Sequence, residues 1–329
     1  MTHNMKTGLL TMFIASLFLL AGCGGGQPQN DLTNPFIGGN IALNLYLQEG
    51  APPPVVYDGN KFPFGINIVV ENVGEADIGP GTDNIYVSSR IEGILPENFG
   101  VADADLRQVL NEKIEGAHKN FDGTIIGGRV ANFYFPAPPK SLNYQTRLQG
   151  NQQITLRGTV CYDYSNRATS QLCFKNDIIE NVQDSTICTL TGDKLVHNSG
   201  GPVHISKITQ NPLGPNKIQL TFTVEHVGPG EFYGRAQGED CNPSVRNTNK
   251  YVVALNVNVD DPTATVTCFR LNNGRTGSVT LYGGAPQTLT CQIESRATSR
   301  LHTSIVNIES LYRYGQFIEQ PILIQAVPQ

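Results

Sequence analysis

The stretch FGINIVVENVG, residues Phe64–Gly74, decides the fold of this chain, because its apolar residues fall on alternate positions. Alternation over this length places one face of a β-strand on a core and the other toward polar surroundings. A similar stretch, IQLTFTVEHVG, spans Ile218–Gly228, 154 positions later. Both end in Val-Glu-x-Val-Gly, a strand end followed by a turn glycine. Two matching strands one domain length apart predict a duplicated β-sandwich.

A second internal match supports duplication. The tetrapeptide CYDY at Cys161–Tyr164 parallels LYRY at Leu311–Tyr314, at an offset of 150. Both copies fall on the penultimate strand of the module expected around them. Paired tyrosines at such a position can cover a core while their hydroxyl groups reach the backbone near a corner.

Length and composition favour an all-β protein of two domains. The chain has 329 residues, 34 glycines, 20 prolines and no tryptophan, and its apolar runs are short. Its formal net charge is −5, and only 16% of its residues are charged. The chain therefore lacks the basic character expected of a nucleic-acid-binding protein.

The N-terminal segment has the layout of a signal peptide. The uncharged apolar run Gly8–Ala21 follows Lys6 and is too short for a comfortable membrane span. The sequence Leu-Ala-Gly-Cys ending at Cys23 resembles the lipobox of prokaryotic lipoproteins. That resemblance implies cleavage before Cys23, lipid attachment to its thiol and anchoring of the exported chain to the membrane. The alternative is an ordinary signal peptide with a chance cysteine.

The expected organisation follows from turns and linkers. We predict a signal peptide over residues 1–22, a flexible tether over 23–38, a first Ig-like β-sandwich over 39–183, a linker over 184–202 and a second Ig-like sandwich over 203–329. The second sandwich is expected to fold by itself, because it has its own set of alternating strands. Apolar residues at helical spacing also predict a short amphipathic helix within Val101–Ala117, inserted in the first sandwich.

Six cysteines remain after Cys23, and export favours disulfides among them: Cys161, Cys173, Cys188, Cys241, Cys268 and Cys291. A hairpin that turns at Arg167 would place Cys161 opposite Cys173 on one face. The alternative is a bridge from Cys173 to Cys188. Cys268 and Cys291 would bracket a further hairpin. No CxxC pair or histidine at metal-ligand spacing indicates zinc.

Motifs of catalysis are absent from the sequence. It contains no HExxH, no G-x-S-x-G and no phosphate-binding glycine loop. Acidic pairs at Asp103/Asp105, Glu239/Asp240 and Asp260/Asp261 could contribute to a calcium site, but none fits an EF-hand, and Asp103/Asp105 is better explained by helix capping. We therefore expect no catalytic residue, no metal and no cofactor.

The motifs resemble those of CARDB-type and related Ig-like modules of prokaryotic surface proteins. More specifically, the chain resembles uncharacterised secreted archaeal proteins with two such modules. The corresponding pieces are the Cys161–Cys173 segment, the Gly200–Val203 linker and Ile205–Ile324. The linker here is a shortened GGPV, and His226 replaces Asn72 in the second copy. The resemblance implies tandem Ig-like sandwiches outside the cytoplasm and brings no assigned activity.

These observations predict an exported, lipid-anchored surface protein that is not an enzyme. Its role would be structural or adhesive, holding an unknown surface protein or a glycan near the membrane, with no nucleic-acid partner. The alternative is a lipoprotein that captures a substrate for a transporter or a secreted enzyme. A concave site with convergent polar groups favours capture, whereas a flat surface or a strand edge favours assembly.

Overall fold

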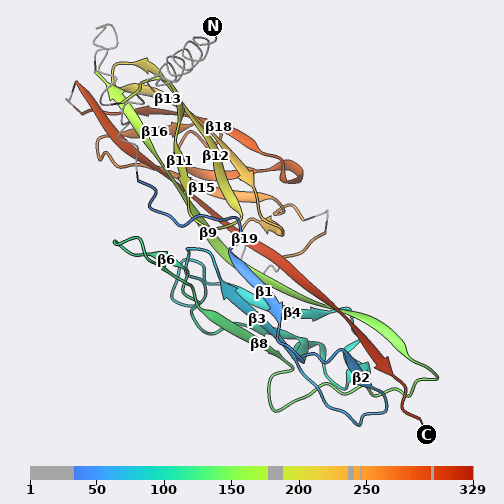
Figure 1. Ribbon diagram of the computed structural model, residues 1–329. Coiled ribbons are helices and arrows are strands. Elements are labelled where there is room, and N and C mark those ends of the chain that lie inside the picture. Colours follow the sequence, from blue (N-terminus) through green and yellow to red (C-terminus); the bar gives the residue numbers. More distant parts are fainter. Residues whose placement is uncertain (1–32, 177–187, 236–240, 245–246, 298–299, 329) are drawn as a thin grey trace, which may run out of the picture. The chain divides into compact units, whose positions relative to one another are not determined.

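The computed structural model describes residues 33–176, 188–235, 241–244, 247–297 and 300–328 (Figure 1). In these ranges the chain is all-β, and its helices are short 3-10 turns at Pro96–Phe99, Asp103–Leu106 and Tyr282–Gly284. The signal peptide, Cys23 and the first part of the tether lie outside the described residues.

The first repeated stretch forms β3 (Ile66–Asn72), the middle strand of a three-stranded sheet. It pairs antiparallel with β1 (Leu43–Leu47) on one side and with β8 (Val130–Phe135) on the other. Its apolar face is buried as the alternation predicts. The opposite face is also covered at Asn67, whose amide donates to the side chains of Gln48 and Asn132.

The second repeated stretch forms β13 (Lys217–His226), the middle strand of a five-stranded sheet. The sheet order is β10 (Gly192–Lys194), β12 (Val203–Gly214), β13, β18 (Gln287–Glu294) and β16 (Thr265–Cys268). The pairing repeats that of the first copy. Asn72 pairs with the first residue of β1, and His226, 154 positions later, pairs with the first residue of β12.

Two long strands, β9 (Gln152–Lys175) and β19 (Leu301–Gln325), form the centre of the fold (Figure 1). They pair antiparallel without interruption from Leu301↔Lys175 to Ile324↔Gln152. Shorter strands complete their sheet and are β2 (Val55–Tyr57), β4 (Val87–Glu92), β5 (Arg107–Val109), β11 (Val196–Asn198), β14 (Glu231–Tyr233), β15 (Val252–Val259) and β17 (Thr276–Thr280).

Each long strand serves both copies. In the first copy, β4 pairs with the N-terminal part of β9, and β5 pairs with β4. In the second copy, β15 pairs with the N-terminal part of β19, and β17 pairs with β15. The C-terminal part of each long strand then lies beside the other copy, where β9 pairs with β11 and β19 pairs with β2. The division into two separable domains stays a prediction.

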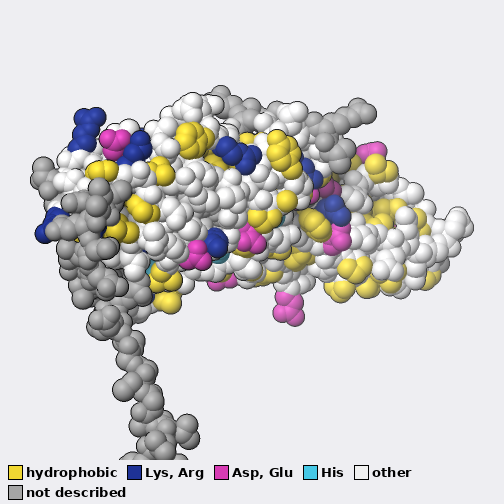
Figure 2. All heavy atoms as spheres, turned by 90° about the horizontal axis from the view of Figure 1, so that it is seen from above, with side chains coloured by type: hydrophobic (Ala, Val, Ile, Leu, Met, Phe, Trp, Pro, Cys, Tyr) yellow, Lys and Arg dark blue, Asp and Glu magenta, His cyan; other side chains and the backbone are white. Residues whose placement is uncertain are grey.

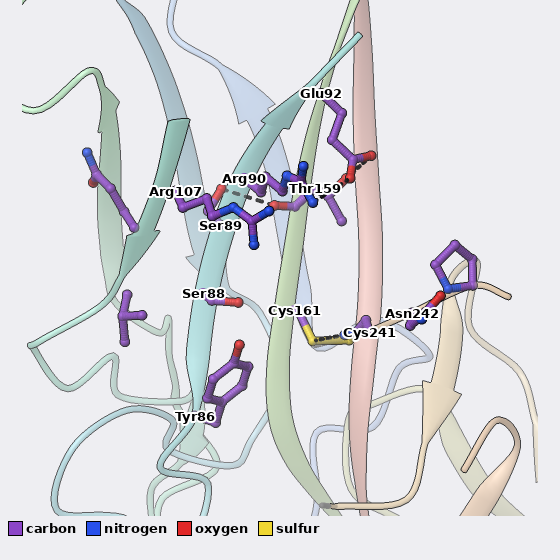
Figure 3. A pocket seen from close by; sticks show the side chains of 13 residues that line it. Tyr86, Ser88, Ser89, Arg90, Glu92, Arg107, Thr159, Cys161, Cys241 and Asn242 are labelled. Carbon is purple, nitrogen blue, oxygen red and sulfur yellow. Dashed lines mark hydrogen bonds and ion pairs between the residues drawn. A yellow bond between two sulfur atoms is a disulfide. The ribbon is translucent and has the colours of Figure 1, made fainter. Parts of the chain in front are cut away.

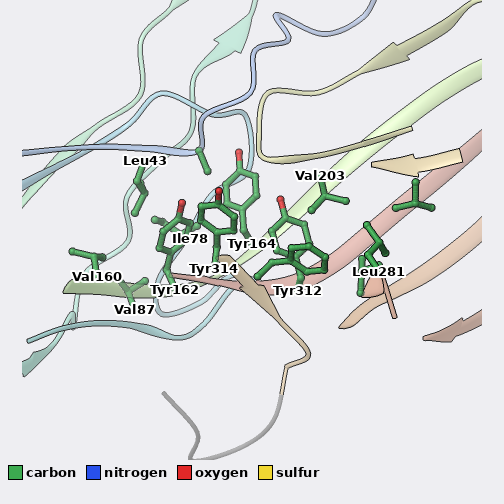
Figure 4. Packing of buried hydrophobic residues seen from close by; sticks show 14 of the residues in the cluster. Leu43, Ile78, Val87, Val160, Tyr162, Tyr164, Val203, Leu281, Tyr312 and Tyr314 are labelled. Carbon is green, nitrogen blue, oxygen red and sulfur yellow. The ribbon is translucent and has the colours of Figure 1, made fainter. Parts of the chain in front are cut away.

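Four tyrosines of the duplicated tetrapeptides lie fully buried where the long strands cross from one copy to the other (Figure 4). Tyr164 is opposite Tyr312, and Tyr162 is opposite Tyr314. The Tyr164 hydroxyl accepts a hydrogen bond from the Ala76 amide (3.2 Å) and donates to the Gly200 carbonyl (2.8 Å). The Tyr164 and Tyr314 hydroxyl groups thus reach backbone at corners, as the sequence predicts, whereas those of Tyr162 and Tyr312 donate to the side chains of Gln316 and Asn166. Burial raises the pKa of all four tyrosines.

A buried ion pair joins the residues that lie between the two tyrosines of each tetrapeptide. Arg313 Nε donates to Asp163 Oδ1 at 2.9 Å, and the two side chains are only 6% and 11% exposed. The Arg313 guanidinium also lies 4.1 Å from the centre of the Tyr86 ring. Nearby, Arg235 donates to the carbonyls of Tyr164 (2.7 Å) and Tyr312 (3.2 Å), and burial lowers its pKa.

The predicted hairpin around Arg167 is wrong, and so is the Cys161–Cys173 bridge. Strand β9 runs straight through Arg167, so the two cysteines lie on one face but about 40 Å apart at 3.3 Å per residue. The small polar residues that suggested a turn are instead covered by the linker. Asn166 donates to the Ser199 carbonyl at 3.0 Å, which satisfies a polar side chain inside a continuous strand.

The predicted helix within Val101–Ala117 is also not observed. The segment forms one 3-10 turn at Asp103–Leu106, then β5, and then an isolated bridge between Ile114 and Ile78. Leu106 is buried at the end of the 3-10 turn, and Leu110 and Ile114 are buried from chain that is not helical. Pairing with the free edge of β4 satisfies the backbone better than an isolated short helix could, since most helical stability comes from tertiary packing.

Candidate functional site

The outer face of four adjacent strands forms the floor of a groove, which we call the ribbon groove. Strands β5, β4, β9 and β19 lie side by side in this order. Register aligns their outward residues in rungs. One rung joins Arg90 to Thr159 and Thr159 to Phe317, and the next joins Ser88 to Cys161 and Cys161 to Gly315.

Two cavities adjoin along this floor. The first has a volume of about 490 Å³ and is lined by β4, β5, β9 and residues 241–243 (Figure 3). The second has a volume of about 460 Å³ and extends over β19 toward residues 229–233. Glu92, Thr159, Cys241 and Pro243 line both cavities. These volumes fall in the range of small-ligand sites in proteins.

A disulfide fastens one wall of the ribbon groove to its floor. Cys161 of β9 is bonded to Cys241, 80 positions later, and the Cys241 amide lies 2.9 Å from the Cys161 sulfur (Figure 3). Gly315 makes room for this wall, because a Cβ atom added there would lie 2.8 Å from the Cβ of Cys241. The bridge holds Cys241–Pro243 over the long strands.

Charged side chains of the groove are paired and half-exposed. Arg157 on β9 meets Glu319 on β19 with N–O distances of 2.6 and 2.8 Å. Arg107 Nε donates to Asp103 at 3.0 Å, and Arg90 lies 3.6 Å from the same carboxylate. Exposed pairs of this kind contribute little to stability. They do offer hydrogen-bond donors and acceptors at fixed positions on a solvent-facing surface.

Aromatic side chains lie at the second cavity. Phe317 is 59% exposed, and the Arg157 guanidinium lies 4.4 Å from its ring centre. On the wall, Glu231 accepts from the Tyr233 hydroxyl at 2.7 Å and from Lys250 at 2.6 Å. Burial raises the pKa of Glu231, but these two hydrogen bonds outweigh it and the net pKa is lowered. Burial and the adjacent carboxylate raise the pKa of Tyr233.

The six cysteines predicted to form disulfides are all bonded. The pairs are Cys161–Cys241, Cys173–Cys188 and Cys268–Cys291. The pairing of Cys173 with Cys188 is the alternative left open above, and Cys268 and Cys291 face each other on β16 and β18. Three disulfides point to an oxidising, extracytoplasmic location. The predicted lipid attachment residue Cys23 lies outside the described residues.

The acidic pairs do not assemble into a metal site in the described part of the chain, where no group of metal-ligating side chains converges. Asp103 and Asp105 bind Arg107 and Lys140. Asp261 accepts from the Ser295 hydroxyl at 2.5 Å and from the Thr263 amide at 2.8 Å. Glu239 and Asp240 lie outside the described residues.

The described histidines are dispersed rather than clustered. His204 Nε2 lies 3.1 Å from the Gly39 carbonyl, and His226 Nε2 lies 3.2 Å from the Tyr314 hydroxyl. Burial lowers the pKa of both. The His302 ring stacks on Phe174. Each of these three histidines has a local partner from a neighbouring segment.

Sequence reasoning missed the residues of the ribbon groove other than its cysteines. Arg90, Arg157 and Phe317 occupy the outward positions of alternating strands, which sequence patterns treat as ordinary solvent-facing positions. The one available signal was that apolar residues occupy the same set of alternate positions on both sides of Arg167, which would have indicated a single long strand. Nothing in that alternation identifies β19 as its partner.

The surface carries no extended region of one charge on the face shown in Figure 2, where basic, acidic and apolar side chains are interspersed. None of the helices within the described ranges is long and apolar enough to cross a membrane. No known family model matches this chain, and no curated protein sequence is significantly similar to it.

Proposed function

We propose that this protein is an exported lipoprotein, anchored through Cys23, that binds an envelope glycan or surface protein in the ribbon groove and catalyses no reaction. Its mature part would consist of two Ig-like sandwiches that share the strands β9 and β19. Strands β1, β3, β4 and β8 of the first copy correspond in their pairing to β12, β13, β15 and β18 of the second. This correspondence supports the arrangement.

The observation that carries the proposal is the pair of adjoining cavities over the long strands. Their walls combine paired arginines and carboxylates with an exposed aromatic ring. A ligand rich in hydroxyl groups, such as a glycan, can bond to the arginines and carboxylates that line the cavities while an apolar face of a sugar packs on Phe317. The described lining residues include no histidine, and their sulfur atoms belong to one disulfide.

The test is a binding titration of the purified protein with envelope oligosaccharides of increasing length. We expect Phe317→Ala to weaken binding about tenfold, which corresponds to about 1.4 kcal/mol. Arg157→Gln should weaken it as well. Phe269→Ala is the matched control, because Phe269 is similarly exposed (53%) but does not line the groove. Equal affinities for the wild type, the groove variants and the control would count against a glycan site.

The cavity volumes favour a second candidate, capture of a small substrate for a transporter or a secreted enzyme. Each cavity alone could accommodate a drug-sized molecule. The two candidates differ in their dependence on ligand length. Affinity that rises with each added sugar favours holding of a polymer across both cavities. Affinity that is highest for a mono- or disaccharide favours capture.

A further inference from the structure

The hairpin formed by β6 (His118–Lys119) and β7 (Ile125–Ile126) pairs with no other described strand. Its turn is ordered by its own hydrogen bonds. The Asn120 amide donates to the Thr124 carbonyl at 2.8 Å, and the Thr124 amide donates to the Asp122 carboxylate at 2.9 Å. An isolated two-stranded hairpin is marginally stable by itself.

Every residue of this hairpin is exposed, including its large apolar side chains. Phe121 at the turn has a relative exposure of 115%, so its ring touches almost nothing else in the protein. Ile125 and Ile126 are 58% and 43% exposed. Three large apolar residues gathered on one small projection differ from the singly scattered apolar residues of an ordinary surface and mark a contact site.

The base of the hairpin lies beside the point where the described chain begins. Pro35 and Phe36 line the same cavity as Ala117, His118 and Lys119. Only twelve positions separate Pro35 from Cys23. A fully extended chain of that length spans at most about 40 Å. A lipid on Cys23 would therefore hold this region of the protein within reach of the bilayer.

We propose that Phe121, Ile125 and Ile126 insert into the surface of the lipid bilayer. The inference rests on the lipid anchor of the proposed function and adds a second contact to it. Membrane attachment by one weak element is reversible, and a second apolar contact strengthens it and fixes orientation. Lys119 at the base of the hairpin can meet lipid phosphates, while the charged Asp122 limits how deeply the turn inserts.

The absence of tryptophan makes a direct test possible. Phe121→Trp in the full-length protein, purified from membranes and reconstituted in phosphatidylcholine–phosphatidylglycerol vesicles, introduces a single tryptophan at the turn. Its emission should shift to shorter wavelength and be quenched by lipids brominated on the acyl chains. Tyr282→Trp is the matched control, since Tyr282 is 72% exposed in the second copy, and its emission should not respond. Ile126→Trp should respond as Phe121→Trp does.

A second variant tests whether the phenyl ring drives the contact. Phe121→Ser, introduced into the Ile126→Trp protein, should reduce the ratio of quenched to unquenched emission, which reads the equilibrium constant for insertion, roughly tenfold, the effect expected from removing one large apolar side chain. Near-ultraviolet circular dichroism of the buried tyrosines would verify that the fold is intact. An unquenched Phe121→Trp emission overturns the inference, and the exposed hairpin would then serve a protein partner.

The lipid anchor and the hairpin contact can be tested independently of each other. Mass spectrometry of the N-terminal peptide reads the lipid on Cys23 independently of fluorescence. An unmodified Cys23 together with quenched emission from the Phe121→Trp protein would remove the anchor and keep the hairpin contact. A lipidated Cys23 with unresponsive emission from the same variant would keep the anchor and refute the contact.

Discussion

The two copies of the repeated strand end in corners that share one construction and differ in what holds it. In each copy a tyrosine hydroxyl accepts a hydrogen bond from the amide two residues beyond the turn glycine. Ala76 donates to Tyr164 at 3.2 Å, and Gly230 donates to Tyr314 at 2.6 Å. A Cβ atom at Gly74 would lie 2.0 Å from its tyrosine oxygen, and one at Gly228 2.4 Å from the other.

The copies differ at the position before the final Val-Gly. Asn72 is fully buried, and its amide donates to the carbonyls of Ala76 (2.9 Å) and Ile114 (3.2 Å). His226 is only half-buried and packs against Phe232 and the Tyr314 ring. The first corner is therefore held by groups that do not titrate near neutral pH. The second places a titratable ring at the same point of the fold.

The difference also appears between the tyrosines, where Asp163 of the first copy meets Arg313 of the second. Identical residues at both positions would place like charges opposite each other, which destabilises an antiparallel pair. Because the two tetrapeptides differ at this position, the opposite charges of Asp163 and Arg313 stabilise the antiparallel pairing of β9 with β19. The lesson is that the copies are alike where each builds its own corner and complementary where they meet.

Separating the copies should have the largest effect. Residues 201–329 alone retain the strands of the second copy from β12 onward but lose β10 and β9, and the loss of β9 leaves one whole edge of β19 unpaired. We expect this fragment to remain β-rich and to self-associate through that edge, because an unpaired strand is a template for pairing. Light scattering after size-exclusion chromatography measures this. Residues 150–329, which include β9, are the control and should be less prone to associate. A monomeric, cooperatively folded 201–329 fragment would show that the second copy does not need the pairing of β19 with β9 in order to fold.

Breaking the complementary pair should have the next largest effect. Asp163→Asn leaves Arg313 buried without its carboxylate and should lower the free energy of unfolding by about 3–5 kcal/mol. The double exchange Asp163→Arg with Arg313→Asp should recover part of this loss, because the two positions are directly opposite. Denaturant unfolding of the three proteins provides the comparison. If the exchanged protein recovers no stability, then Tyr86 and Arg235, rather than the pair itself, decide which strand carries the arginine and which the aspartate.

Removing the hydroxyl groups separates the two corners. Tyr164→Phe deprives both the Ala76 amide and the Gly200 carbonyl of a partner and should cost about 2 kcal/mol. Tyr314→Phe deprives the Gly230 amide and His226 Nε2 of a partner, but half-buried His226 can turn to water instead, so the cost should be smaller, about 1 kcal/mol. Thermal unfolding at pH 8 measures both. A larger loss for Tyr314→Phe would mean that the histidine corner is the stronger one.

The smallest expected effect concerns pH. Burial lowers the pKa of His226 below its value in the unfolded chain, and the nearby Glu231 carboxylate only partly opposes this. The unfolded state therefore binds more protons, so the stability due to neutral His226 is complete above about pH 6.5 and is lost as pH falls through the folded pKa.

His226→Asn, which restores the residue of the first copy, should reduce this loss of stability between pH 7 and pH 5. Burial also lowers the pKa of His204, so His204→Asn is a matched variant that tests the other contribution. Urea midpoints measured across this range give the comparison. An unchanged pH profile in the His226→Asn protein would contradict a neutral histidine at the second corner.

Much of the fold is predictable from the sequence, because the signals are local. The alternation in Ile66–Asn72 and Lys217–His226 depends only on which residues face a core. The tyrosine corners follow from the repeated tetrapeptides in the same way. The prediction of a helix within Val101–Ala117 was wrong because it used only the local spacing of apolar residues. In the folded protein part of this segment pairs as β5 with the edge of β4.

The ribbon groove and the Cys161–Cys241 disulfide were not predictable from the same signals. The Cys161–Cys241 bridge joins positions 80 residues apart, and the rung from Thr159 to Phe317 joins positions 158 apart. An outward polar residue on a strand looks the same whether solvent or a neighbouring wall faces it. The assignment of residues 165–169 to a turn centred on Arg167 also hid the long strand on which the groove depends.

The sequence by itself determined that this protein is all-β, that its strand pattern is duplicated and that tyrosines close its corners. These properties depend on the periodicity of a few consecutive residues. Only the tertiary structure decided that β9 and β19 pair with each other, which cysteines meet and where a groove opens. The physical reason is that alternation specifies the face of a strand but not its partner, whereas pairing depends on which distant edge remains free when the sheets assemble.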